Sequence, residues 1–470
     1  MFILMVVVFV LGYTAIALEH PLKVDKAASA LILGMAMWVI FVFGRVDILN
    51  MLNETGQFLS QSWRGYVHEA GIENPTSGDM LNFITHYDVM HHLAEISTIL
   101  FFLLGAMTIV ETVDQHEGFK IITDKIKTTN KVKFLWIISI LTFFMSATLD
   151  NLTTTIVLIA LLRKLIADQK ERWLYASMVV LAANAGGAWS PIGDVTTIML
   201  WIGGQVTTVN IILMVFLPSL VTMVVPVVIL SFYLKGDIER PKLNETETKE
   251  FTTPFERNLL FYMGVGGLLF VPVFKTVTHL PPYMGMLLSL GVIWVTTEIM
   301  HRSKPLKDRR TLTVMGVLRK VDVPTIFFFL GILSAVAAMQ SAGHLTLLAD
   351  WLNVNVGNIY VINLIIGVLS AIVDNVPLVA GAMGMYEVAQ AGATGYEAYF
   401  VVDGIFWEFL AYCAGTGGSI LIIGSAAGVA AMGMEKIDFI WYMKKISILA
   451  LLGYLAGAAV YWAQVQILHY

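Results

Sequence analysis

Apolar stretches of the kind that cross a lipid bilayer recur along the whole chain. Examples lie at 31–42, 99–110, 259–274 and 446–462. A membrane-spanning helix needs roughly 20 predominantly apolar residues. Only 13% of the 470 residues are charged, whereas a soluble protein of this length would carry about a quarter. The predicted fold class is therefore an all-α polytopic membrane protein.

The composition also excludes several function classes. The chain's single cysteine, Cys413, cannot form an internal disulfide framework or a cysteine-ligated metal site. A net charge of −5 gives no support to a nucleic-acid partner. No run resembles a phosphate-cradling loop, so ATP-driven transport has no support and no cofactor is predicted. The protein is expected to use ion gradients or to be a passive channel.

The first apolar stretch, 2–18, has the length of a signal peptide. It lacks a basic segment at its start and a cleavage site of small residues followed by a soluble domain. We therefore expect it to be retained, so that 1–26 forms an extra N-terminal helix.

Clusters of lysine and arginine predict which loops face the cytoplasm, because cytoplasmic loops carry an excess of both residues. Such clusters lie at 301–320, 235–257, 120–133 and 163–172. Two polar stretches that are poor in lysine and arginine, 47–88 and 353–358, are placed outside. These sides set the direction of the helices between them.

A polar break separates two apolar runs, 134–145 and 153–162, whose outer flanks are both basic. The chain therefore enters and leaves this region on the cytoplasmic side. A re-entrant hairpin over 132–168 explains the pattern, and two full helices joined outside would also satisfy the charges. We favour the hairpin, whose break reads S-A-T-L-D-N at 146–151.

A second copy of this break, S-A-I-V-D-N, lies at 370–375, which is 224 positions later (370 − 146). Its flanks carry no lysine or arginine, so this second hairpin, over 356–390, is placed on the outside. A glycine motif, G-G-x5-G, also occurs twice, at 186–193 and at 417–424, with an offset of 231 (417 − 186). Matched motifs that enter from opposite faces indicate an inverted-topology repeat.

The chain is thus predicted to contain five segments. They are an extra N-terminal helix (1–26), a first inverted repeat (27–234), a cytoplasmic linker (235–257), a connecting helix (258–282) and a second inverted repeat (283–465). In each repeat the re-entrant hairpin is followed by a helix broken at its glycine pair, over 173–201 in the first and 399–433 in the second.

Three carboxylates, Asp150, Asp194 and Asp374, lie at breaks inside otherwise apolar segments. A carboxylate in the hydrocarbon region is costly unless it faces protein, water or an ion. Where a helix unwinds at membrane depth, free carbonyls and helix ends can coordinate a cation. Oxygen ligands suit a hard cation such as sodium, and these motifs contain no soft ligand. The alternative is that Asp and Asn here merely cap helix ends.

The predicted site consists of oxygen-bearing residues within or beside the breaks. For ion binding and proton exchange these are Asp150, Asn151, Thr154, Asp194, Thr196, Asp374, Asn375, Ser419 and Ser425. Sodium itself is placed at Asp150, Asn151, Asp374 and Asn375. Asp194 in the first glycine motif corresponds to Ser425 in the second (425 − 194 = 231), so the site is predicted to be symmetric in position but not in charge.

Glu95, Asp322 and Glu408 also lie in apolar surroundings and are possible proton relays. Glu95 and Asp322 each precede a T-I-x-F-F motif by three residues (98 − 95 and 325 − 322), which makes them equivalent in the repeat. Either they end helices at the membrane interface, which we favour, or they carry protons between bulk water and the site.

Three strings resemble those of the NhaD-type sodium/proton antiporters. They are L-D-N-L-T-T-T-I-V at 149–157, A-N-A-G-G-A-W-S-P-I-G-D-V-T-T at 183–197 and V-D-N-V-P-L-V-A-G-A-M at 373–383. This group belongs to a larger ion-transporter superfamily that includes arsenite-efflux and dicarboxylate carriers, and the resemblance covers about 91–434. It implies inverted repeats with hairpins, a transport domain that moves against a scaffold, often a homodimer, and roles in exchange for the predicted site residues.

The dicarboxylate relatives carry Ser-Asn-Thr at their hairpin tips, whereas this chain carries Asp-Asn, whose charge would repel an organic anion. We therefore predict a secondary antiporter, not an enzyme, that exchanges Na⁺ or Li⁺ for H⁺. An arsenite or dicarboxylate carrier and a structural subunit of a membrane complex are the alternatives. The predicted partners are these ions and the lipid, with no nucleic acid, and the predicted location is a bacterial inner (cytoplasmic) membrane, with multiple passes.

Overall fold

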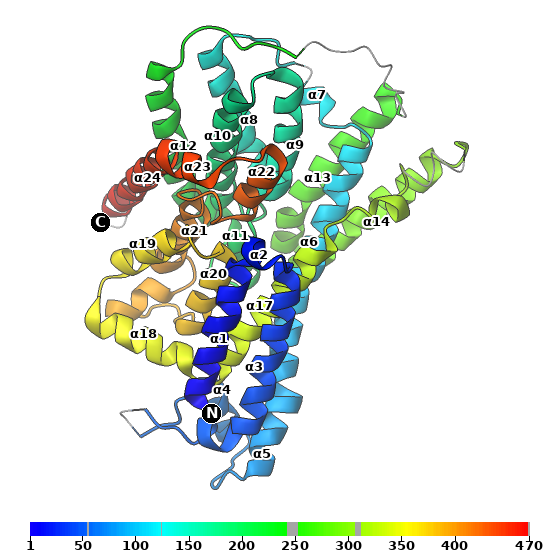
Figure 1. Ribbon diagram of the computed structural model, residues 1–470. Coiled ribbons are helices and arrows are strands. Elements are labelled where there is room, and N and C mark those ends of the chain that lie inside the picture. Colours follow the sequence, from blue (N-terminus) through cyan, green and yellow to red (C-terminus); the bar gives the residue numbers. More distant parts are fainter. Residues whose placement is uncertain (54–55, 124, 242–251, 306–311, 469–470) are drawn as a thin grey trace. The chain divides into compact units, whose positions relative to one another are not determined.

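Helices form nearly all of the regular structure in this computed structural model, which describes residues 1–53, 56–123, 125–241, 252–305 and 312–468 (Figure 1). Within these ranges the β-structure is limited to three isolated bridges. Part of the predicted cytoplasmic linker, 242–251, and part of the basic segment, 306–311, lie outside the described residues.

Eight helical segments of the described chain are long and apolar enough to cross a bilayer. They are Lys26–Leu49, Ser77–Gln115, Lys131–Leu149, Thr208–Tyr233, Pro254–Thr278, Pro282–Met300, Val323–Ser341 and Ser447–Leu468. Large apolar side chains on their outer faces are exposed, for example Phe43 and Phe232. Because such surfaces suit lipid and not water, these helices confirm the prediction of an all-α polytopic membrane protein.

The chain divides into two compact units. The first contains residues 1–101, 322–362 and 377–388. Its helices are α1 (Phe2–Ala17), α2 (Glu19–Leu22), α3 (Lys26–Leu49), α4 (Gln61–Glu69), α5 (Ser77–Asn82), η1 (Phe83–Asp88), the first part of α6 (Val89–Gln115), α17 (Val323–Ser341) and α18 (His344–Asn355). Helices α3 and α17 touch through Gly34 and Gly331, where an added Cβ on Gly34 would lie 2.5 Å from the Gly331 carbonyl oxygen.

The second unit contains residues 102–321, 363–376 and 389–470. Besides the rest of α6 it holds α7 (Lys120–Thr123), α8 (Lys131–Leu149), α9 (Asn151–Leu165), α10 (Gln169–Ala188), α11 (Val195–Ile202), α12 (Thr208–Tyr233), α13 (Pro254–Thr278), α14 (Pro282–Met300), α16 (Val314–Val317), η2 (Gly395–Phe400), α21 (Ile405–Gly417), α22 (Ala426–Glu435), α23 (Phe439–Lys445) and α24 (Ser447–Leu468). Helices α19 (Ile359–Leu369) and α20 (Asn375–Met385) contribute to both units.

Helices α8 and α9 form a hairpin that turns back at Asp150. The amide of Lys131, at the start of α8, donates to the Gly236 carbonyl at 3.1 Å, and the amide of Ala167, just after α9, donates to the Glu239 carbonyl at 2.9 Å. Both outer ends of the hairpin therefore lie against the same short segment. How deep the turn lies in the membrane stays a prediction.

The two hairpin breaks make the same contact with the helix that follows each hairpin. The Ser146 hydroxyl donates to the Ala183 carbonyl at 2.6 Å, and the Ser370 hydroxyl, 224 positions later, donates to the Ala414 carbonyl at 3.0 Å. Each hairpin is thus fixed to its broken helix by an equivalent bond. The opposite membrane orientation of the two copies stays a prediction.

Glycine allows the same close approach in both copies. Gly186 lies against the backbone of Phe143, and Gly417 lies against the backbone of Gly367, so closely that a Cβ on either motif glycine would overlap a carbonyl oxygen. Gly187 likewise meets Gly193 across the first break. The glycine pairs are therefore required by backbone packing between the hairpin and the broken helix.

A buried carboxylate ties three of these helices together. Glu435 ends α22, and its side chain is 1% exposed. It accepts from Arg163 of α9 at 2.6 Å and from Arg172 of α10 at 3.0 Å.

We expect Glu435→Ala to lower the free energy of unfolding by about 2 kcal/mol, because removing one partner leaves the arginines without their counter-charge. The larger value usual for a buried pair is reduced here because Arg163 is about half exposed. The midpoint of thermal unfolding in detergent measures the effect. The exposed Glu69 of α4, replaced by alanine, is the control, and equal midpoints for the two variants would contradict the prediction.

Candidate ion-binding site

Oxygen-bearing side chains begin the helix that follows each break. Asp150 has a positive φ of 78° and caps α9, with its Oδ1 accepting from the Thr153 amide at 2.7 Å. Asp194 caps α11, and Ser425 caps α22. The N-terminal amides of a helix lack partners within the helix, and short polar side chains supply them. Asp150, Asp194 and Ser425 therefore do cap helices, as the alternative interpretation of the sequence expected. Asp194 and Ser425 also make hydrogen bonds to residues outside the helices that they cap.

The side-chain amide of Asn184 connects the helix breaks of the two sequence copies. Asn184 of α10 donates through Nδ2 to the hydroxyl oxygens of Ser419 and Ser425, at 2.9 Å each. Its Oδ1 accepts from Asn151 Nδ2 at 3.0 Å. Asn151 in turn donates to Asp194 Oδ2, also at 3.0 Å. Residues separated by more than 200 positions are thereby brought into one hydrogen-bonded network.

Asp194 provides the carboxylate of this network. It is 1% exposed, and its Oδ1 accepts from the Thr196 amide at 3.1 Å. Besides Asn151, the amide of Asn375 approaches Oδ2, at 3.5 Å. Asp150 and Asp374 lie close enough to repel it electrostatically. Three carboxylates in one low-dielectric region are stable together only when protons or cations offset their charge.

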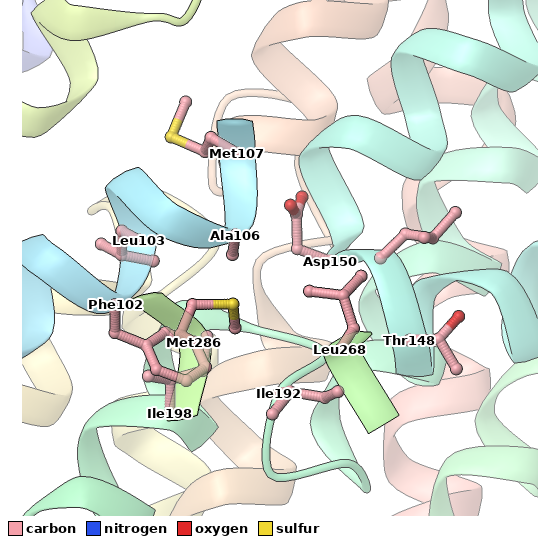
Figure 2. A pocket seen from close by; sticks show the side chains of 11 residues that line it. Phe102, Leu103, Ala106, Met107, Thr148, Asp150, Ile192, Ile198, Leu268 and Met286 are labelled. Carbon is pink, nitrogen blue, oxygen red and sulfur yellow. The ribbon is translucent and has the colours of Figure 1, made fainter. Parts of the chain in front are cut away.

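A small cavity reaches Asp150 from the side of α6, α13 and α14 (Figure 2). Its volume is about 20 Å³, enough for a water molecule. The residues that line it are Phe102, Leu103, Ala106, Met107, Thr148, Leu149, Asp150, Ile192, Ile198, Leu268 and Met286. Figure 2 shows Asp150 as the one carboxylate among these mostly apolar side chains. The cavity therefore gives a water-sized species a place beside this carboxylate.

Nearby threonine hydroxyls, including that of Thr196, are buried without a hydrogen-bond partner among the described protein atoms. The hydroxyl oxygens of Thr154 and Thr155 are buried and make no hydrogen bond with the described protein atoms. A buried polar atom of this kind is costly unless water or an ion contacts it, so both threonines fit a site that takes up a hydrated cation. Thr196 meets Asp194 through its backbone amide.

Asn184 is the residue that the sequence reasoning missed. It lies in the string A-N-A-G-G, two residues before the glycine pair, and an uncharged amide inside a helix gives no signal of its own. Two of the predicted site residues, Ser419 and Ser425, contact Asn184, since both hydroxyl oxygens accept from its amide. Their roles in ion binding stay a prediction.

Comparisons with known proteins show which family the chain resembles. A family profile described as "Citrate transporter" matches residues 7–402. "Sodium/proton antiporter 1" of Arabidopsis thaliana is 44% identical over 468 residues, which cover 99% of this chain and 73% of that protein. "Sodium/proton antiporter 2" of the same plant is 41% identical, over 98% of this chain and 99% of that protein. "Na(+)/H(+) antiporter NhaD" of Alkalimonas amylolytica is 27% identical, over 99% and 91%.

The chain belongs to the NhaD-type sodium/proton antiporter family. The family expected from the three sequence strings is thus confirmed. The profile match of this NhaD-type chain includes Asp150, Asp194 and Asp374 and ends before Ser419, whereas the matches to the plant proteins extend over nearly all of it.

The three possible relay residues of the NhaD-type chain lie outside the network and differ from one another. Asp322 begins α17, where it accepts from the Thr325 amide at 3.3 Å, so the expectation that it ends a helix is confirmed. The same expectation is wrong for Glu95, which lies inside α6 and is 59% exposed. The reason is that α5 and η1 extend the first copy by several turns before this position.

Glu408 is the buried member of the three. It lies in the first turn of α21 and is 1% exposed. Tyr461 donates to its Oε2 at 2.6 Å, and Asn210 donates to its Oε1. These hydrogen bonds join α21 to α12 and α24, so Glu408 holds three helices together.

Proposed function

We propose that this NhaD-type protein is a secondary transporter that exchanges Na⁺ or Li⁺ for H⁺, with both kinds of cation competing for Asp150, Asp194 and Asp374. One observation carries the proposal. A carboxylate that is 1% exposed, that of Asp194, lies among amide donors where the helix breaks meet and within electrostatic reach of two further carboxylates. The printed names of the relatives support Na⁺ and H⁺ as the exchanged ions.

Competition follows from the charge of the cluster. When protons neutralise the carboxylates, a sodium ion has no favourable place, and when sodium enters, protons must leave. If only a neutralised cluster can move between the two faces of the membrane, one ion is exported for the other without separate coupling machinery. Sodium would be held by Asp150, Asn151, Asp374 and Asn375, with Thr154 and Asp194 beside them.

The anion-carrier alternative is weaker for an electrostatic reason. Helix N-termini carry partial positive charge and attract anions, which is compatible with the printed description of the family profile. In this chain Asp150 and Asp194 already place carboxylates on the starts of α9 and α11. An organic anion would have to displace or approach these charges, whereas a cation is attracted by them.

Proton flux in proteoliposomes tests the function. A pH gradient is imposed, and sodium, lithium or potassium is then added. We expect sodium and lithium to dissipate the gradient and Asp150→Asn to reduce the response to that of empty vesicles, because the asparagine retains the shape but neither binds nor releases a proton. If citrate or arsenite dissipated the pH gradient of wild-type proteoliposomes and no alkali cation did, the proposal would be contradicted.

The same proposal includes a homodimer and a bacterial cytoplasmic membrane. A transport domain that moves against a scaffold needs a fixed partner, and a second scaffold supplies one. Short loops and the bacterial NhaD relatives support the location, although the plant relatives have the higher identities. Cross-linking in native membranes and cell fractionation test these two points.

A further inference from the structure

Two buried histidines meet at one end of the second unit. His116 follows the last turn of α6, and His301 follows the last turn of α14. Both are 0% exposed. Their Nε2 atoms are 2.7 Å apart, and their rings are stacked with centroids 5.0 Å apart and planes 18° from parallel. At this separation the two nitrogens share one proton, since two N–H groups cannot face each other.

The surrounding acceptors fix where that proton lies. His116 Nδ1 is 2.7 Å from the Thr112 carbonyl oxygen, which can only accept, so Nδ1 carries a hydrogen. In a neutral ring Nε2 of His116 is then an acceptor, and Nε2 of His301 donates to it. The remaining nitrogen, His301 Nδ1, is buried and makes no hydrogen bond with the residues that the structure describes.

Charged groups face the pair from two helices and the following loop. Glu256 in the first turn of α13 has its Oε1 3.9 Å from His301 Nδ1, and its Oε2 accepts from Lys304 at 2.7 Å. Glu298 of α14 is the further acid that acts on His301. Burial lowers the pKa of both histidines, that of His301 to about 4, with His116 and Lys304 adding to the effect on His301 and the two glutamates opposing it. The pair is therefore neutral near pH 7.

The pair joins the helices that line the Asp150 cavity. Leu103 and Met107 of α6, Leu268 of α13 and Met286 of α14 are all cavity residues. The same helices pack closely further along, where Gly264 of α13 receives Val113 of α6. A change at the His116–His301 end would therefore be transmitted to the wall beside Asp150 through packed helices.

We propose that His116 and His301 form a pH-sensitive clasp that positions α6 and α14 beside the Asp150 cavity, closed when both rings are neutral and opened by protonation. The expected effect on exchange rests on the proposed function, whereas the opening of the clasp does not. Opening at acidic pH would displace the cavity wall and slow exchange.

The sign follows from proton linkage. In an open clasp the histidines regain a pKa near 6.5, whereas in the closed clasp that of His301 is about 4. The open form therefore binds protons more readily, and titration of His301 alone makes the ratio of open to closed clasp rise by up to tenfold for each pH unit between about pH 6.5 and pH 4. Above that pH the closed form keeps its full advantage.

Hydrogen exchange on the purified protein tests the clasp directly. The amide of His116 donates to the Thr112 carbonyl at 3.3 Å, and the amide of His301 donates to the Thr297 carbonyl at 3.0 Å. After correction for intrinsic exchange rates, we expect peptides that contain these amides to open at least about fivefold more at pH 5.5 than at pH 6.5, with titration of His301 alone giving the fivefold. His301→Gln, which replaces the donor by an amide that does not titrate, should weaken this pH dependence markedly, because only His116 is then left to titrate. Opening that does not change with pH in the wild-type protein would overturn the proposal.

Transport at saturating sodium separates the clasp from competition at the ion site. Proton competition raises the apparent KM for sodium and leaves the maximal rate unchanged. Release of the clasp lowers the maximal rate at acidic pH. We expect His301→Gln to restore the maximal rate. The control His68→Gln, at an exposed histidine of α4, should leave the acidic loss of rate as it is in the wild-type protein. If the maximal rate of the wild-type protein does not fall, the clasp does not control exchange. If hydrogen exchange responds but no sodium-dependent flux exists, the proposed function fails and the clasp stands.

Discussion

Replacing Asp194 by asparagine is expected to abolish sodium-dependent proton exchange while the protein stays folded. The asparagine has nearly the same shape, and its Oδ1 can still accept from the Thr196 amide, so the start of α11 is preserved. What is lost is the one negative charge that Asn151 and Asn375 surround. Without it the cluster loses a carboxylate for which protons and sodium compete.

The measurement is the sodium-driven proton flux of the variant in proteoliposomes. Asp322→Asn is the matched control, because Asp322 also begins a helix and accepts from its third amide but lies outside the network. We expect Asp322→Asn to keep most of the exchange and to cost a few tenths of a kcal/mol in stability at most, since asparagine caps nearly as well. Full exchange in Asp194→Asn would show that the network does not carry the ion.

Proton release on sodium binding gives a second readout for the same variant. In a weakly buffered solution the detergent-solubilised wild-type protein should release protons when sodium is added, because the two compete for the carboxylates. Asp194→Asn should release fewer, and Asp322→Asn should release as many as wild type. This experiment needs no vesicle and therefore separates a loss of binding from a loss of movement across the membrane.

The sequence predicted the positions of the breaks because their causes are local. An Asp-Asn pair or a glycine pair favours the end of a helix, and the observed ends at Leu149 and Ala188 lie next to Asp150 and Trp189, although the glycine pair at 266–267 lies inside α13. The repeat offset also predicted which residues correspond, and the Ser146 and Ser370 hydroxyls make equivalent hydrogen bonds. Local chemistry and the repeat together were sufficient for this part of the fold.

Pairing between distant side chains could not be predicted in the same way. Asn184 reaches Ser425 across 241 positions and His116 reaches His301 across 185 positions, and neither residue stands out by charge or spacing. The placement of Glu95 was missed for a related reason, because α5 and η1 run directly into α6 before it, whereas within the described residues 312–321 only the short α16 and a turn precede Asp322. A repeat conserves the path of the backbone better than the environment of each side chain.

The repeat also explains why one carboxylate, and not two, occupies the network. The position that corresponds to Asn184 is Gly415 (184 + 231), and the one that corresponds to Asp194 is Ser425. A Cβ on Gly415 would lie 3.7 Å from Asp194 Oδ2 and 2.9 Å from the Ala188 Cβ. The second copy thus supplies space and hydroxyls where the first supplies the amide and the charge, so the two copies form one asymmetric hydrogen-bonded network.

Backbone packing around that site leads to the second large expected effect, which is the loss of the site's structure in Gly417→Ala. Gly417 ends α21 directly against the backbone of Gly367 in α19, and an added Cβ would overlap the Gly367 carbonyl oxygen. Backbone cannot move aside as a flexible side chain can, so α21 and α19 must separate. We expect a cost of roughly 3 kcal/mol, together with a large loss of exchange because Ser419 and its bond to Asn184 follow two residues later.

Gly433→Ala is the matched control, since Gly433 lies inside α22 and a Cβ there would meet no atom within 4 Å. Alanine is the better helix former by about 1 kcal/mol, so this variant should unfold at the wild-type temperature or above it and should exchange normally. The midpoint of thermal unfolding in detergent and the sodium-driven flux are measured for both variants. Equal midpoints would mean that α21 and α19 do not touch at Gly417, and the close backbone contact that fixes the second hairpin to the network would have to be abandoned.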